Sequence, residues 1–311
     1  MGRTIIVGLP RSGTTWLSRT VARAPGVSYV HEPDNRGVDP HAWVGTRGLG
    51  SVPWLQPGQR ADNYRRLWAV AFSGGWPKEP GLVPTLLRAG RSQRLPRAVR
   101  VALLKQAARI AAPRPPRGQH QVVKSVSAYL SIEWIVREFA PDVIVVWRHP
   151  LNVAPAWIDR GWTTVSTVLG GDAVRSRFER TPVWPPPEDD TLIAAAWSAC
   201  ARSVLLLETA ARHPEWMLLS HEQQCVDPIA GFTRVFRRIG LEWTAETERA
   251  IDEQNRPGTG YVTQRLWRNE PRRWRERLSP EEQDAVGSVV AGFERISDVA
   301  ADLWRSSIAV T

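Results

Sequence analysis

The residues best suited to bind a charged group lie in a short loop near the N-terminus. The segment runs Gly8-Leu9-Pro10-Arg11-Ser12-Gly13-Thr14-Thr15-Trp16, directly after the apolar run Ile5-Ile6-Val7. Free backbone amides at the start of a helix bind anions, and an arginine side chain adds two parallel hydrogen-bond donors. The pattern therefore predicts a phosphate-type site formed by Arg11, Ser12, Gly13, Thr14 and Thr15.

The spacing of this loop limits which phosphate compound it can hold. It resembles the P-loop of nucleoside-triphosphate enzymes, but Thr14 stands where that loop carries its lysine. A later apolar run, 143–147, ends in Arg148 rather than in the aspartate that would hold magnesium. Two strand ends that each offer an arginine predict a ligand with two separated anionic groups, held without a metal.

Two further side chains could take part in proton transfer and charge stabilisation. Glu32 follows one short apolar run, and Lys124 ends another. Ligands of open α/β sheets bind beyond the carboxyl ends of the strands, so both side chains should face the same crevice as Arg11. We expect Glu32 to be the general base, and Lys124 and Arg11 to stabilise charge in the reaction. Glu32 could instead form a buried ion pair with a loop arginine or cap a turn, and Lys124 could lie at the surface. His31 is the weaker candidate for the base.

Alternating strands and helices are needed to bring these residues together. Short apolar runs predict strands at 5–7, 27–30, 121–124, 143–147 and 216–220. Longer patterns predict helices at 15–24, 63–72, 83–112, 132–139, 148–157 and 192–211. Residues 37–119 are rich in Gly, Pro and Trp and form a helical and loop insertion. Its tryptophans are candidates for an apolar acceptor pocket, although most of them should belong to the core: Trp43, Trp54, Trp68 and Trp76.

Composition favours one elaborated α/β domain spanning 1–311. The 34.9 kDa chain is 42% hydrophobic, which allows a full core. The 41 basic and 31 acidic residues give a net charge of +10, and only three of the basic residues are lysines. Because the arginines are scattered along the chain, no nucleic-acid partner is expected. Cys200 and Cys225 have no metal spacing and should be reduced. We expect no membrane span and no signal peptide, and thus a cytoplasmic location.

The motifs together resemble the family of sulfotransferases that use 3′-phosphoadenosine 5′-phosphosulfate (PAPS). The resemblance rests on Gly8 to Trp16, on Arg148-His149-Pro150-Leu151-Asn152-Val153-Ala154, and on the block from Ser220 to Pro228. It implies a three-layer P-loop nucleotide-kinase-like fold with a central parallel sheet of four or five strands and helical insertions. It also implies that the first motif cradles the 5′-phosphosulfate of PAPS and that Arg148 binds the 3′-phosphate. The start of the chain lacks the membrane helix of Golgi-type members, which favours a bacterial-type, soluble enzyme.

The resemblance also assigns roles to individual residues. Trp16 and His221 stand where the family places residues that contact the adenine. Asn152 could replace a 3′-phosphate contact that is lost because the family's serine is Ala156 here. The basic segment 253–278 resembles the family's lid loop, in which the closest matches to the phosphate-binding arginine are Arg268 and then Arg265.

Two features, a departure from the family and a match to one of its branches, bear on the choice of base. Val126 stands where cytosolic members carry a catalytic histidine, which removes the usual base. Glu32 lies 21 residues after Arg11, at the distance where tyrosylprotein sulfotransferases place a catalytic glutamate. The resemblance therefore supports Glu32.

The predicted function is metal-independent transfer of a sulfuryl group from PAPS to a hydroxyl of a small-molecule, sugar or lipid acceptor. Two other functions stay open at this stage. One is a P-loop kinase or NTPase, and the other is a non-catalytic nucleotide-binding protein. The acceptor and the oligomeric state, including a homodimer, are not fixed by the sequence.

Overall fold

The computed structural model describes most of the 311-residue chain. The described residues are 2–74, 87–89, 91–92, 100, 103–104, 119–161, 172–187, 191–258 and 265–309. The predicted helix 83–112 falls almost wholly outside these ranges, as do Trp76 and Gly260.

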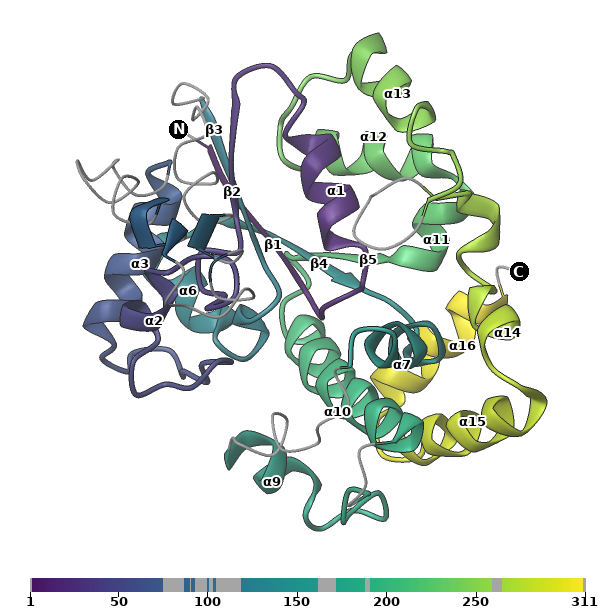
Figure 1. Cartoon of the computed structure of the whole chain (residues 1–311). Coiled ribbons are helices and arrows are strands. Elements are labelled where there is room, and N and C mark those ends of the chain that lie inside the picture. The colour runs from purple at the N-terminus through teal and green to yellow at the C-terminus, as the bar shows by residue number, and fades with distance from the viewer. Residues whose placement is uncertain are drawn as a thin grey trace.

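A five-stranded parallel sheet forms the centre of the molecule (Figure 1). Its strands are β1 (Gly2–Gly8), β2 (Val27–His31), β3 (His120–Ser125), β4 (Asp142–Trp147) and β5 (Met217–Ser220). The order is β2-β3-β1-β4-β5, and every neighbouring pair is parallel. The strands are covered on both faces, which explains their continuous apolar runs. The prediction of an α/β fold with a central parallel sheet is confirmed.

Helices cover both faces of the sheet and make three layers (Figure 1). Alternation along β1 shows the two sides, since Ile6 packs into one core cluster and Ile5 and Val7 into another. The cluster with Ile6 includes residues of α1 (Thr14–Val21), α11 (His221–Val226), α12 (Pro228–Arg238) and α13 (Ala245–Asp252). The opposite cluster includes residues of α3 (Asp62–Phe72), η1 (Ala128–Leu130), α6 (Ile132–Phe139), α7 (Pro150–Ile158) and α10 (Leu192–Ala211).

The C-terminal part adds a third core cluster against α7 and α10. In it, residues of α10 pack against α15 (Pro280–Glu294), α16 (Asp298–Ala309) and Phe178 of α9 (Asp172–Phe178). Among the described residues, α10 is the one helix long and apolar enough to cross a membrane, and most of that stretch is buried inside the protein. The remaining elements are α2 (Ala42–Gly45), η2 (Trp267–Asn269) and α14 (Arg273–Arg277).

Several predicted elements match the structure closely. The helices at 132–139 and 192–211 have the predicted bounds, and the strands agree to within a few residues at each end. The insertion contains α3 as predicted and also α2. Trp68 is buried in the core, whereas Trp43 is 61% and Trp54 39% exposed. The segment predicted as a lid loop carries the short elements η2 and α14.

Candidate active site

The anion loop is held by its own residues and by α7. Ser12 donates twice to the carbonyl of Leu9, from Oγ at 2.7 Å and from its backbone N at 3.2 Å. Trp157 Nε1 donates to the carbonyl of Pro10 at 3.0 Å. A side chain at Gly8 would collide with the backbone of β4, and Gly13 has a φ of 91°. The turn therefore needs both glycines, and the Ser12 hydroxyl serves the turn itself.

The loop leads into α1 with its first amides available. Gly13 is the N-cap of α1 and provides no side-chain cap, so the amides of the first turn have no partner within the helix. Arg11 has a φ of 69°, a conformation that is costly for an arginine. Thr14 is buried and Thr15 is half-buried. This geometry is the helix N-terminus that the sequence predicts for a phosphate.

Trp16 and His221 lie together behind the loop. Their rings meet edge to face at 5.9 Å, and Trp267 covers Trp16 at 6.2 Å with an angle of 30° between the planes. His221 lies close to Gly13, and its Nε2 is 3.7 Å from Cys225 Sγ. Burial, and then the charge of Arg148, lower the pKa of His221 to about 3. Both side chains are buried here, so their predicted contacts with adenine stay predictions.

Glu32 and Lys124 form a buried ion pair at the carboxyl ends of β2 and β3. Lys124 pairs with His31 in the sheet register, and the backbone N of Glu32 continues the ladder to the Lys124 carbonyl at 2.7 Å. Beyond this point the Lys124 Nζ contacts Glu32 Oε1, while Asn35 Nδ2 donates to Oε2 at 2.5 Å. Glu32 is 8% exposed and Lys124 2% exposed. The structure thus brings Glu32 and Lys124, two of the three predicted catalytic residues, into direct contact.

The surroundings keep Glu32 ionised. Burial alone raises the pKa of Glu32, but the charges of Lys124 and His31 and the hydrogen bonds from Lys124 and Asn35 outweigh it and lower the pKa. Glu32 also has a φ of 48°, in the left-handed region that non-glycine residues rarely adopt. Such strain persists where the surrounding structure enforces it, and it concentrates at functional sites.

His31, the second candidate for the base, lies at the edge of this pair. Its Nε2 is 3.7 Å from Glu32 Oε1, and its Nδ1 is 2.6 Å from the hydroxyl of Tyr29. That hydroxyl also contacts Ser18 Oγ at 3.0 Å, and burial raises the pKa of Tyr29 to about 12. His31 is more exposed than Glu32, so it connects the buried pair to the surface.

Asp34 is a buried carboxyl group that the sequence analysis did not single out. Ser125 Oγ donates to its two oxygens at 2.7 and 2.9 Å, and Tyr64 donates at 3.4 Å. The same Ser125 hydroxyl accepts the backbone amides of Ser127 and Ala128, each at 3.0 Å. Burial raises the pKa of Asp34 to about 7. Asp34 therefore fastens the chain after β2 to the end of β3, next to Lys124.

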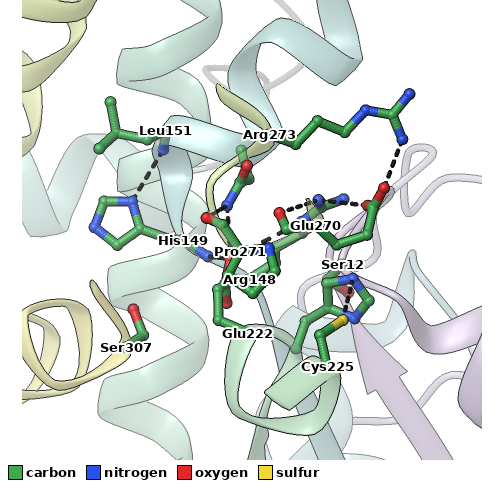
Figure 2. Close-up of polar contacts among 12 residues, drawn as sticks. Ser12, Arg148, His149, Leu151, Glu222, Cys225, Glu270, Pro271, Arg273 and Ser307 are labelled. Carbon is green, nitrogen blue, oxygen red and sulfur yellow. Dashed lines mark hydrogen bonds and ion pairs between the residues drawn. The ribbon is translucent and has the colours of Figure 1, made fainter. Parts of the chain in front are cut away.

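Arg148 lies on the other side of β1, directly after β4. Its Nη1 donates to the carbonyl of Arg11 at 3.3 Å. Its Nη2 donates to Glu270 Oε2 at 2.9 Å, a contact drawn in Figure 2. Its Nε lies 3.9 Å from Glu222 Oε1. Arg148 thus joins the anion loop to the C-terminal segment.

Glu270 also contacts two arginines of the C-terminal segment. Arg273 Nη1 donates to Glu270 Oε1 at 2.6 Å, as Figure 2 shows, and Arg265 Nε lies 3.8 Å from the same oxygen. Arg268 is exposed and has no ion pair within the described ranges. Of the two arginines predicted for this role, Arg265 is the one placed beside Arg148. The sequence analysis missed Glu270 and Arg273 as site residues.

Asn152 connects α7 to the same segment. Its Nδ2 donates to Glu222 Oε1 and to the Pro271 carbonyl, each at 3.0 Å, and its Oδ1 accepts the Trp274 amide at 3.2 Å. Glu222 also accepts the backbone amide of His149 at 3.1 Å. In this structure Asn152 positions the C-terminal segment, and its predicted contact with a phosphate stays a prediction.

A cavity of about 340 Å³ lies apart from these groups. Trp54 and Tyr129 line it, together with the ion pairs Arg177–Glu208 and Arg212–Glu133. Of the candidate tryptophans that the structure describes, Trp54 lines this cavity. Glu32, Lys124 and Arg148 do not line it.

Metal ligands do not gather in the part of the chain that the structure describes: it holds no group of three or more His, Cys, Asp or Glu side chains suited to an ion. Cys200 and Cys225 are both free and buried, and burial raises the pKa of each thiol.

Comparison with known proteins finds similarity at the level of structure. No protein-family model matches the chain, and no curated protein sequence matches it. The fold is similar to mouse sulfotransferase SULT7A1 complexed with PAP, with 11% identity, 99% of this chain and 89% of that one covered, and a TM-score of 0.46. It is also similar to the sulfotransferase domain from the curacin biosynthetic pathway, with 13% identity, coverage of 93% and 97%, and a TM-score of 0.45. Sulfotransferase STF9 from Mycobacterium avium shows 15% identity, coverage of 95% and 76%, and a TM-score of 0.42. These solved structures belong to the family that the motifs resemble.

Proposed function

We propose that this protein is a PAPS-dependent sulfotransferase that sulfates a hydroxyl group without a metal ion. The observation that carries the proposal is the buried Glu32–Lys124 pair, placed by adjacent strand ends at the edge of the sheet where the anion loop opens. A base and a cation in contact are what hydroxyl activation and charge stabilisation require.

The residues around the loop suit the two phosphate positions of the donor. The amides at the start of α1 and Arg11 would hold the 5′-phosphosulfate, and Arg148 would hold the 3′-phosphate. The fit is supported by the start of α1, where Gly13 provides no side-chain cap and the amides of the first turn have no partner within the helix. A helix start of this kind binds phosphates.

In the proposed reaction Glu32 takes the proton from the acceptor hydroxyl. The oxygen forms a bond to sulfur while the bond from sulfur to the 5′-phosphate oxygen breaks, and that oxygen leaves with the electron pair as 3′-phosphoadenosine 5′-phosphate (PAP). Lys124 holds Glu32 ionised before reaction. When Lys124 turns toward the charge that develops on the leaving oxygen, Glu32 loses its main counter-ion and becomes a stronger base.

We propose metal independence because the protein supplies its own positively charged groups at the site. A sulfuryl group carries less negative charge than a phosphoryl group, so Arg11, Lys124 and the loop amides can stabilise the charge that shifts to the leaving group. The acceptor is proposed to be a small molecule, carbohydrate or lipid. The cytoplasmic location stays a prediction, supported by the free thiols of Cys200 and Cys225.

The test is calorimetric titration with PAP, AMP and ATP in EDTA, followed by transfer of labelled sulfate from PAPS to a panel of phenols and sugars. We expect PAP to bind more tightly than AMP or ATP, and labelled product to form with EDTA present. A preference for ATP, or loss of all transfer on chelation, would contradict the proposal.

A further inference from the structure

Arg148, Arg265 and Arg273 form an arginine cluster around the carboxylate of Glu270. The two oxygens of Glu270 are shared between Arg148, at 2.9 Å, and Arg273, at 2.6 Å (Figure 2). Arg265 Nε lies 3.8 Å from one of them. Glu270 is only 5% exposed. A carboxylate in contact with several guanidinium groups occupies the position that such a cluster offers to a phosphate.

Glu270 keeps its charge in this position. Burial raises its pKa, but the charges of Arg148 and Arg273 and the hydrogen bond from Arg273 contribute more and lower it to about 2. Glu222 Oε1 lies farther away, 3.9 Å from Arg148 Nε, and accepts hydrogen bonds from Asn152 and His149. Glu270 is therefore the carboxylate in closest contact with Arg148.

The same turn also covers the ring that is predicted to contact the adenine. Trp267 lies in η2, three residues before Glu270, and its ring centroid is 6.2 Å from that of Trp16. Aromatic rings in direct contact have centroids about 4.5 to 7 Å apart, so Trp267 packs against Trp16. One short turn thus places an aromatic ring on Trp16 and an anion on Arg148.

Contacts to the segment after β4 hold this turn in place. Arg148 Nη2 also approaches the Glu270 carbonyl at 3.4 Å, and Asn152 bonds to the backbone of Pro271 and Trp274. The turn takes no part in the sheet, so it can move away while the strands stay paired. Loop segments of this kind commonly close over or open an active site.

We propose that Glu270 is a resident anion on Arg148 that a nucleotide with a phosphate at this position must displace, and that it thereby limits the affinity of the protein for PAP. The proposal rests on the proposed function, in which the 3′-phosphate of the donor binds Arg148. A phosphate monoester carries more charge and one more acceptor oxygen than a carboxylate, so it competes for the same guanidinium groups. A ribose hydroxyl is neutral and does not compete.

The consequence is a difference between PAP and AMP. PAP must expel Glu270, and part of its interaction with Arg148 is used for that exchange. AMP has no group for Arg148 and leaves Glu270 in place. Removing the charge of Glu270 should therefore strengthen the binding of PAP and leave that of AMP unchanged.

The experiment is calorimetric titration of full-length wild type and Glu270→Gln with PAP and AMP. We expect the PAP affinity of the variant to rise about tenfold, the effect of one charge-assisted hydrogen bond, with AMP unchanged. Glu242→Gln is the matched control, because it removes one negative charge from an exposed residue of a loop. Glu270→Asp is the second variant, whose shorter side chain cannot reach Arg148 and Arg273 together and should raise PAP affinity by a smaller factor.

The outcomes separate the two proposals. A rise for PAP alone in Glu270→Gln, absent in Glu242→Gln, supports the role of Glu270. If wild type binds PAP and neither Glu270 variant changes its affinity, or if AMP gains equally, the role of Glu270 is overturned while the sulfotransferase proposal stands. If no protein binds PAP, both are overturned. Thermal unfolding of each variant verifies that it is folded.

Discussion

Two carboxylate–cation groups flank β1, and they are built in different ways. On one side Glu32 contacts Lys124, and both residues come from the ends of paired strands. On the other side Glu270 contacts Arg148. Arg148 follows a strand, but Glu270 does not. The sheet register fixes the first pair, whereas the second depends on a turn that packs against the segment after β4. The first pair is thus suited to preorganised chemistry and the second to exchange with a ligand.

The largest effect should come from neutralising the carboxylate of the first pair. Glu32→Gln removes the proposed base, and general-base catalysis contributes about 10² to 10⁴ in rate, so sulfuryl transfer should fall by that factor. PAP affinity, measured by calorimetry, should stay unchanged because Arg148 is untouched. His31→Gln is the matched comparison. If it abolishes transfer while Glu32→Gln remains active, His31 is the base.

Changing the cation of the first pair should alter the pH dependence. Lys124→Met removes a charge stabiliser, which we expect to reduce kcat about a hundredfold. Lys124 lowers the pKa of Glu32, so its loss raises that pKa, and ionised Glu32 then persists only at higher pH. The acid limb of the pH–rate profile should therefore move to higher pH. An acid limb that does not move would contradict the coupling.

The second pair can be weakened without removing its charge. Arg148→Lys keeps one positive charge but loses the two parallel donors. PAP affinity should fall about tenfold to a hundredfold, as for loss of a charge-assisted hydrogen bond, while AMP affinity stays the same. Titration of both nucleotides measures this. An equal loss for AMP would show that Arg148 does not read the 3′-phosphate.

The smallest effect should come from Asp34, which fastens the chain after β2 to the end of β3, next to Lys124. The pKa of Asp34 is raised to about 7 from an ordinary 3.8, so the folded state favours the neutral form. The stability from Asp34 is then fully present below pH 3.8 and is lost as pH rises toward 7. Asp34→Asn mimics the neutral form, so its stability relative to wild type should increase by about 2 kcal/mol between pH 5 and pH 8. Urea unfolding at the two pH values measures this difference, and a constant difference would contradict the raised pKa.

Most of the first region could be predicted from the sequence. Glu32 and Lys124 each follow a short apolar run, and the carboxyl ends of parallel strands meet at one edge of a sheet. The strand order was not predictable from these runs, yet it is the adjacency of β2 and β3 that turns two crevice residues into a contacting pair. Asp34 gave no signal, because its partners Ser125 and Tyr64 are distant in sequence.

The second region was predicted only in part. Arg148 was found because it follows an apolar strand, and the resemblance ranked Arg268 first and Arg265 second. Glu270 and Arg273 lie in an irregular segment, where no periodicity fixes the direction of a side chain. The two glutamates among the arginines of 265–277, Glu270 and Glu276, were the available signal, since a buried cationic cluster needs a counter-ion. The sequence analysis counted the charges there and did not pair them.

The most direct test of the account is a crystal structure of the protein with PAP bound. We predict that the 5′-phosphate lies against the amides at the start of α1, that the 3′-phosphate takes the place of the Glu270 carboxylate on Arg148, and that Glu32 and Lys124 stay beside the 5′-phosphate and open to an acceptor. PAP bound elsewhere, or bound with its 3′-phosphate away from Arg148 and Glu270 unmoved, would contradict the account.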